Sequence, residues 1–358
     1  MSGSRPSGGG RLSAPGALAG PSVAAEGAGL PGQDAGLPAE PLAALAARYG
    51  LKPSAARPPL LDYLRQLWQR RYFIVGFATA RNVAMYTEAR LGQVWQILTP
   101  LLNVAVYYLI FGLILNTSHG VHNFVAFLVI GVFVFNFTQR SFIIASRVMW
   151  DSLPLIRALY FPRACLPLGY VLIELQQLMM SFVVVFAIVL ISGEPLTWYW
   201  LLIIPVLVLQ TLFNVGAAFI LARFGAGFDD VSQLLPFIVR TWFYASGVMF
   251  SIQTFSTLAR HPVVAKVLQY NPAAIYITLA RNALMRSQRL SIPGAKPYNA
   301  ARCALYHQAR AVNYLNSAYC HAVASQTGLW LAGAAWAVVV LVAGFAFFWR
   351  AEVQYGRG

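Results

Sequence analysis

Six long apolar stretches constrain this chain more than any other feature of its sequence. A helix needs about 20 apolar residues to cross a bilayer, and each stretch is close to that length or longer. They are Val94–Leu115, Val121–Gln139, Ala164–Ser192, Leu196–Ala222, Gln233–Ile252 and Thr327–Trp349. Lipid offers no partner to unpaired backbone groups, so open sheets cannot replace helices. The sequence therefore predicts an all-α polytopic membrane protein with six transmembrane helices.

The composition agrees with that class. Hydrophobic residues make up 58% of the chain and charged residues 10%, whereas a soluble domain carries about a quarter charged residues. The net charge of +15 is distributed around the apolar stretches, which is not typical of a nucleic-acid-binding surface. We therefore expect contact with membrane lipids and none with nucleic acid.

Arginine and lysine set the expected orientation, because cytoplasmic loops are enriched in them. The region before Val94 holds ten, and the loop Arg140–Arg163 holds four arginines. The short loops Asn116–Gly120 and Gly193–Pro195 hold none. Both termini are thus predicted on the cytoplasmic side of the cytoplasmic membrane. The outer segment Ser251–Gly328 is basic, but loops longer than about 60 residues escape this rule.

The N-terminal part divides in two. Residues 1–58 are rich in Gly, Pro, Ala and Ser, and such segments bury too little apolar surface to fold. We predict a disordered cytoplasmic arm there. Residues 59–93 begin with leucines at helical spacing over Leu60–Arg71, with arginines on or near the other face. This pattern is typical of an amphipathic helix lying on the membrane surface.

Residues 94–349 form the predicted membrane domain, and residues 350–358 a cytoplasmic tail. Within the domain, residues 254–326 form an outer region. Asn271-Pro272 marks a helix start there, because proline is favoured in a first turn. We predict two short re-entrant helices, Val263–Gln269 and Pro272–Met285, on the outer side.

Glu174 and Arg240 are the clear charges inside the predicted spans, each at roughly 10–15 Å depth. A charge at such depth is normally paired or functional. One interpretation is a Glu174–Arg240 ion pair that locks two helices. The other is that Arg240 faces a conduit and meets a phosphate on a substrate.

Aromatic residues are abundant in the first and fifth stretches, and sugars stack on aromatic rings. Most of these side chains should serve packing and the membrane interface; a minority could line a glycan passage. The candidate conduit residues are Tyr107, Tyr108, Phe111, Arg240, Trp242, Phe243 and Tyr244.

The three cysteines show no metal-ligand spacing, and no nucleophile–base pair is recognisable. We therefore expect no catalytic residue, no metal and no cofactor on this chain. Cys303 and Cys320 lie about 25 Å apart on one unbroken helix. A disulfide between them requires a fold-back near Asn313–Ser317, because Cα atoms must come within about 7 Å.

The chain contains no GxxxxGK[ST] phosphate loop, so energy for active transport must come from another polypeptide. The loop Trp150–Pro167 is the candidate contact. It combines a short amphipathic helix, flanking prolines and apolar residues rimmed by arginines, which is typical of a docking surface. The alternative is a helix resting on the lipid surface.

The loop and several other motifs, in this order, resemble the permease subunits of ABC-2-type exporters of the O-antigen, teichoic-acid and galactan group. The resemblance covers about Leu60 to Gln354. The motifs on which it rests are Arg90-Leu91-Gly92 with Trp95 and Pro100, Leu155–Arg163, Arg223-Phe224 through Asp229-Asp230-Val231, Leu235-Pro236-Phe237 and Asn271-Pro272.

The resemblance implies a homodimer of six-helix permeases with two copies of a separate ABC ATPase, which binds ATP and Mg. It implies a passage lined by the first and fifth spans and a coupling helix that inserts into the ATPase. The matching residues are Leu155, Ile156, Arg157, Tyr160, Phe161, Pro162 and Arg163. This chain departs from the pattern at Ala164-Cys165, where an acidic residue is expected, and in the longer segment Ser287–Gln326.

The implied cargo is a polysaccharide linked to polyprenyl pyrophosphate, for cell envelope biogenesis. The Ala-, Arg- and Gly-rich composition is typical of a GC-rich actinobacterium, for which a galactan would be the polymer. Two alternatives stay open: an ABC-2 permease for drugs or small lipids, and a membrane glycosyltransferase, for which acidic or histidine catalysts are missing.

Overall fold

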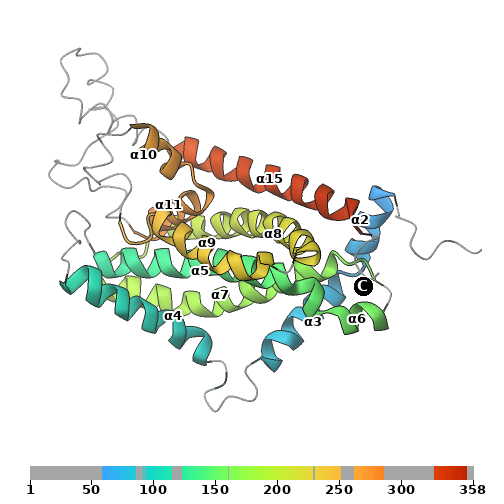
Figure 1. Ribbon diagram of the computed structural model, residues 1–358. Coiled ribbons are helices and arrows are strands. Elements are labelled where there is room, and N and C mark those ends of the chain that lie inside the picture. Colours follow the sequence, from blue (N-terminus) through green and yellow to red (C-terminus); the bar gives the residue numbers. More distant parts are fainter. Residues whose placement is uncertain are drawn as a thin grey trace, which may run out of the picture. The chain divides into compact units, whose positions relative to one another are not determined.

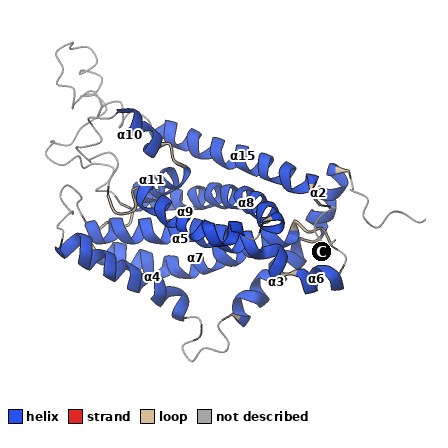
Figure 2. Cartoon of the chain, in the orientation of Figure 1, coloured by secondary structure: helices blue, strands red, loops and turns tan. Residues whose placement is uncertain are grey.

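The computed structural model describes residues 59–85, 92, 94–114, 123–159, 161–228, 230–250, 262–285 and 326–352. All of them belong to one compact unit, Ala55–Gly358. Over these ranges the chain forms helices joined by turns, without a strand (Figure 2). The predicted all-α class is confirmed. The predicted arm 1–58, the cysteines Cys303 and Cys320, and most of the outer region lie outside the described residues.

Within the described ranges, four helices are long and apolar enough to cross a membrane. They are α5 (Phe124–Asp151), α7 (Cys165–Ile191), α8 (Ile203–Gly227), which the 3₁₀ turn η2 (Trp198–Leu202) precedes, and α15 (Gln326–Arg350). The predicted third and sixth spans coincide with α7 and α15 to within a few residues. The chain is thus a multi-pass membrane protein.

The predicted first and fifth spans correspond to less regular helices. The first is α4 (Val94–Tyr107), which continues as the π-helix η1 (Tyr108–Ile114). The fifth is α9 (Asp230–Ala245), with 16 residues and Pro236 inside it. Spanning helices use about 20 residues, so a count of six spans stays a prediction.

Two helices extend beyond the ends predicted for their spans, for the same reason. Helix α5 continues past Gln139 to Asp151, and α8 continues past Ala222 to Gly227. In both cases the prediction took an arginine as the end of the apolar stretch. Inside the fold, Arg140 donates a hydrogen bond to Gln177 and Arg223 donates to the carbonyl of Phe347. Because these donors find acceptors, the helices need not end.

Helix α8 forms the most extensive contacts, with α15 on one side and α5 on another (Figure 1). Glycines make the close approach possible. A Cβ on Gly216 of α8 would collide with the backbone of Leu341 in α15, and a Cβ on Gly344 would collide with Gly216 itself. A Cβ on Gly225 would likewise meet the carbonyl of Ser146 in α5. Backbones that pack this closely fix the register of the three helices.

The short helices gather at two opposite ends of these long ones (Figure 1). At the end where α15 finishes lie α2 (Leu60–Gln69), α3 (Arg71–Ala84) and α6 (Leu153–Ala158). At the end where α5 and α15 begin lie α10 (Pro262–Gln269) and α11 (Pro272–Leu284).

Helices α10 and α11 lie where two short outer helices were predicted around the Asn271-Pro272 step, while their re-entry into the membrane stays a prediction. The Asn271 side chain caps α11 by accepting a hydrogen bond of 3.2 Å from the N–H of Ala273. Arg281, one of the positive charges of the basic outer segment, does not face solvent. It is buried and donates to the carbonyls of Phe127, Gly247 and Val248, so it holds α11 against its neighbours.

Candidate functional site

The segment after α5 is the predicted coupling segment. Ser152 and Pro154 begin α6, and the chain becomes extended at Leu159. Leu155, Ile156 and Phe161 are half-buried and pack against the core on one side. They are therefore less exposed than predicted, and Leu159 is instead the exposed apolar side chain.

The remaining predicted coupling residues lie around this short helix. Arg157 is exposed, Pro162 is buried and Arg163 is half-buried. Tyr160 lies outside the described residues. The segment thus presents one partly apolar side outwards while its other side is held by the protein.

Three parts of the chain meet just after the coupling segment, around the carboxylate of Glu352. The Tyr63 hydroxyl on α2 donates to Glu352 Oε2 at 2.8 Å, and the N–H of Arg163 donates to Glu352 Oε1 at 3.0 Å. The Arg163 guanidinium donates to the Glu352 carbonyl. The Tyr63 hydroxyl in turn accepts from the N–H of Ala164 at 3.1 Å. We call Tyr63, Arg163, Ala164 and Glu352 the anchor cluster.

Burial governs the electrostatics of the anchor cluster. Tyr63 is 1% exposed, and burial followed by the charge of Glu352 raises the pKa of its hydroxyl. Burial also raises the pKa of Glu352, although the hydrogen bonds from Arg163 and Tyr63 act in the opposite direction. The cluster joins α2, the end of the coupling segment and the residues after α15.

Helix α3 supports the same region with aromatic contacts. The ring of Phe73 lies 5.5 Å from that of Phe161, and the ring of Phe77 lies 5.7 Å from that of Tyr170 on α7. Direct contacts therefore join the segment after α5 to α2 and α3, and α3 to α7.

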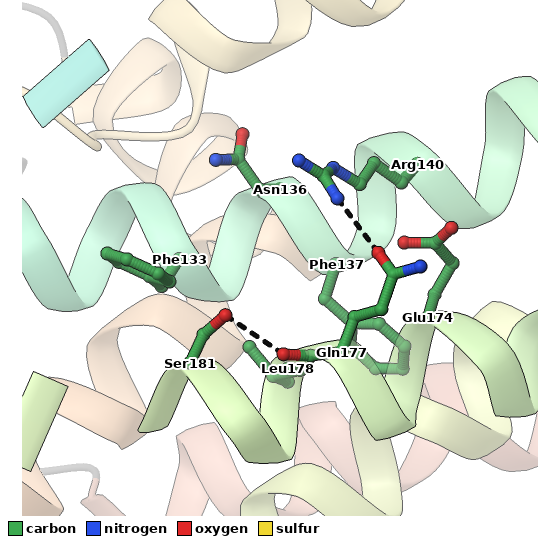
Figure 3. A pocket seen from close by; sticks show the side chains of 8 residues that line it. All are labelled: Phe133, Asn136, Phe137, Arg140, Glu174, Gln177, Leu178 and Ser181. Carbon is green, nitrogen blue, oxygen red and sulfur yellow. Dashed lines mark hydrogen bonds between the residues drawn. The ribbon is translucent and has the colours of Figure 1, made fainter. Parts of the chain in front are cut away.

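A second polar site lies within the long helices, in a pocket between α5 and α7 (Figure 3). Helix α5 contributes Phe133, Asn136, Phe137 and Arg140. Helix α7 contributes Glu174, Gln177, Leu178 and Ser181. Both sets follow the spacing i, i+3, i+4, i+7, which places each set on one face of its helix.

The polar groups of this pocket are linked from helix to helix. Arg140 Nη1 donates to Gln177 Oε1 at 2.9 Å, and Gln177 Nε2 donates to Asn82 Oδ1 of α3 at 3.4 Å. Thr79 of α3 accepts from Gln176 at 3.1 Å. The carboxylate of Glu174 lies beside Arg140, and this side chain is 4% exposed. Helix α3 thus contacts the pocket at one end and the coupling segment at the other.

This arrangement corrects the predicted Glu174–Arg240 pair. The structure does not bring these two side chains together: the positive side chain beside Glu174 is Arg140. Arg240 is exposed on α9, on the side of Tyr107. The prediction failed because it placed Arg140 in a loop, outside the membrane domain.

The predicted conduit aromatics fall into two groups. Phe243 is buried, and its ring lies 5.5 Å from that of Tyr107 and 5.1 Å from that of Phe135. Half-buried Trp242 donates to Asn271 Oδ1 at 2.7 Å. These rings pack within the fold.

Tyr108 and Tyr244 are exposed, so they are the conduit candidates that present an accessible ring. Phe111 lies in η1, and its side chain is outside the described part. A role of these residues in a passage stays a prediction. Of the predicted disulfide nothing is described, and Cys165 is a free, buried thiol.

Sequence reasoning missed Tyr63, Glu352, Arg140 and Gln177. Glu352 did carry a signal, because it is one of only 11 acidic residues and follows the last span directly. Arg140 was interpreted as a loop charge. Tyr63 and Gln177 carry no distinguishing pattern, because their importance comes from partners far away in sequence.

Comparison with known proteins agrees with this architecture. The O-antigen export system permease protein RfbA of Myxococcus xanthus is 24% identical over 238 residues, which are 66% of this chain and 88% of that protein. An O-antigen export system permease protein RfbA of Klebsiella pneumoniae is 24% identical over 201 residues, 56% of this chain and 75% of that protein. Residues 75–285, from α3 through α11, match the family of ABC-2 type transporters. The chain, with its apolar helices and the segment between α5 and α7, therefore belongs to the ABC-2 type transporter family.

Proposed function

We propose that this chain is the transmembrane permease subunit of an ABC exporter that moves a polyprenyl-pyrophosphate-linked polysaccharide across the cytoplasmic membrane. The observation that carries the proposal is the α6 coupling segment, fixed on one side by the anchor cluster and open on the other. Family membership and the names of the similar export permeases support it.

In this proposal, a separate ABC ATPase binds ATP and Mg and docks on α6. The exposed side of the coupling segment carries Arg157 on α6 and Leu159 just after it, and these residues would contact a groove on that subunit. ATP-driven closure would move α6 and, through Arg163 and Tyr63, the helix α2. The chain itself would carry no catalytic residue and both of its termini would be cytoplasmic.

Two exposed apolar surfaces fit further parts of the proposal. On α2 the side chains of Leu61 and Trp68 are 78% and 70% exposed, as expected for a helix lying in the inner membrane interface. On α9, Phe237 and Ile238 are exposed, and such a surface requires lipid or protein cover. We propose a homodimer with six spans in each protomer, whose passage lies along α4 and α9, with α10 and α11 re-entering the membrane on the outer side.

Docking is tested by co-expressing the chain with the ATPase and purifying the complex. Leu159→Asp places an acidic group on the outward side of the coupling segment and should weaken binding at least about tenfold, a loss of about 1.4 kcal/mol. Val264→Asp, at a similarly exposed position of α10, is the matched control and should not change binding. Both variants must elute as folded protein on size exclusion. Equal binding by Leu159→Asp would exclude the coupling segment as the docking element.

The cargo is tested by depleting the protein and analysing lipid-linked glycans on the cytoplasmic side. We expect a polyprenyl-pyrophosphate-linked polymer to accumulate, with a galactan as the expected polymer. Accumulation of small hydrophobic compounds without a glycan would instead indicate an exporter of drugs or small lipids.

A further inference from the structure

The carboxylate of Glu174 is the starting point, because it is buried without a hydrogen-bond donor among the described residues. Arg140 lies beside it, but the hydrogen bond of that guanidinium goes to Gln177. Figure 3 shows the Glu174 carboxylate and the Arg140 guanidinium at the same pocket, each reaching from its own helix. Buried polar groups are normally hydrogen-bonded, so this carboxylate is available to a group that enters the pocket.

The charges at the pocket select the chemistry of that group. The pocket offers one carboxyl group, on Glu174, and one guanidinium, on Arg140. An anion would meet the carboxylate, and a cation would meet the guanidinium. A hydroxyl group can donate to a carboxylate and accept from a guanidinium or an amide. The half-buried Asn136 amide, which also lines the pocket, adds both a donor and an acceptor.

The size of the pocket limits how much of a ligand can enter. Its volume is about 20 Å³, and one water-sized group needs about 10–15 Å³. One or two hydroxyls fit, while a sugar ring stays outside. A neutral molecule with several neighbouring hydroxyls is therefore the class of ligand that matches.

The pocket is connected through α3 to the coupling segment, which would move in the proposed transport cycle. Gln177 contacts Asn82 on α3, and α3 packs on the coupling segment through Phe73 and Phe161. A group held by Glu174 and Arg140 would therefore be bound by helices that the coupling segment can displace.

We propose that the pocket between α5 and α7 binds sugar hydroxyls, with Glu174 as the acceptor and Arg140 and Asn136 as the donors. The inference rests on the proposed function and deepens it, because it assigns a contact for the glycan part of the cargo. A site of this composition favours a carbohydrate over a free phosphate.

The test uses the full chain with its ATPase in membranes, with Cys165, Cys303 and Cys320 replaced by serine and Ser181→Cys as the reporter, because Ser181 lines the pocket but its hydroxyl donates to the Gln177 carbonyl of its own helix. The rate at which a water-soluble thiosulfonate modifies the introduced thiol is measured with galactose, mannose or rhamnose, or with inorganic phosphate. At a sugar concentration equal to its dissociation constant, the rate should fall about twofold. Phosphate should leave it unchanged, and Glu174→Gln should abolish the protection by sugar. Thr241→Cys, exposed on α9, is the control and should not be protected.

Three results would overturn the inference: protection by phosphate alone, no protection by any sugar, or protection that persists in Glu174→Gln. These outcomes are separable from the proposed function. If the ATPase copurifies and lipid-linked glycan accumulates on depletion, loss of sugar protection rejects only the pocket. If sugars protect the reporter thiol but no ATPase binds, the permease proposal fails and the pocket stands.

Discussion

Two carboxylates in this protein, half-buried Glu352 and buried Glu174, have opposite surroundings. Glu352 accepts hydrogen bonds from Tyr63 and from the Arg163 backbone. Glu174 lies beside Arg140 without a hydrogen-bond donor among the described residues. A carboxylate whose oxygens are already occupied serves to hold segments together, whereas one that faces a pocket with free oxygens can bind a ligand. The difference separates an anchoring role from a binding role.

The largest expected effect comes from removing the carboxylate of Glu352, whose oxygens already accept hydrogen bonds. Glu352→Ala leaves the Tyr63 hydroxyl and the Arg163 N–H without an acceptor, and each unsatisfied buried group costs about 1–3 kcal/mol. We expect the free energy of unfolding, measured by denaturant titration in detergent, to fall by about 2–3 kcal/mol. Asp62→Ala, at an exposed position of α2, is the control. A loss no larger than that of the control would remove the anchoring role.

Substitution of Glu174, the pocket carboxylate, should reduce transport more than it reduces the free energy of unfolding. Glu174→Gln keeps the size of the side chain but removes the charge, and a hydrogen bond to a charged group contributes about 1.5–3 kcal/mol. Transport of the lipid-linked glycan in proteoliposomes should fall about tenfold or more, since about 1.4 kcal/mol corresponds to a factor of ten. The free energy of unfolding should change by less than about 1 kcal/mol. Stability that falls as far as in Glu352→Ala would mean that Glu174 also serves to hold the fold.

A double-mutant cycle measures how tightly the anchor cluster acts as a unit. Tyr63→Phe and Glu352→Gln alter the same hydrogen bond, so the two losses should not add. Residues in one network show coupling energies of about 0.5–3 kcal/mol, and we expect about 1 kcal/mol here. Tyr72→Phe, an exposed tyrosine on α3, should be additive with Glu352→Gln. Additive losses for Tyr63 would mean that its hydroxyl is bonded elsewhere.

The smallest expected effect is a dependence of the protein's stability on pH, caused by Glu352. Burial raises the pKa of Glu352 above its ordinary value of 4.5, so the folded state binds a proton more tightly than the unfolded state. Its stabilising effect is present in full below pH 4.5 and is lost as the pH rises through the raised pKa. The stability of the wild type relative to Glu352→Gln should therefore increase as the pH is lowered from about 7 to about 5. A difference that is constant over this range would contradict the raised pKa.

Local patterns predicted several parts of the fold correctly. The apolar lengths of α7 and α15 and the start of α11 at Asn271-Pro272 follow from hydropathy and capping, which depend on neighbouring residues. The short helix α6 followed from its flanking prolines. The same reasoning failed at Arg140 and Arg223, because a charged residue ends a span only if no acceptor reaches it.

The sequence by itself determined that this chain is an all-α membrane protein with a short helix between two of its spans, because length and hydropathy are sufficient for that conclusion. Only the tertiary structure decided which charges meet. It placed Glu174 beside Arg140 rather than beside Arg240, and it joined Tyr63 to Glu352, 289 residues away. The physical reason is that hydropathy is a property of each segment alone, whereas the partner of a buried charge depends on the rotation and register of packed helices.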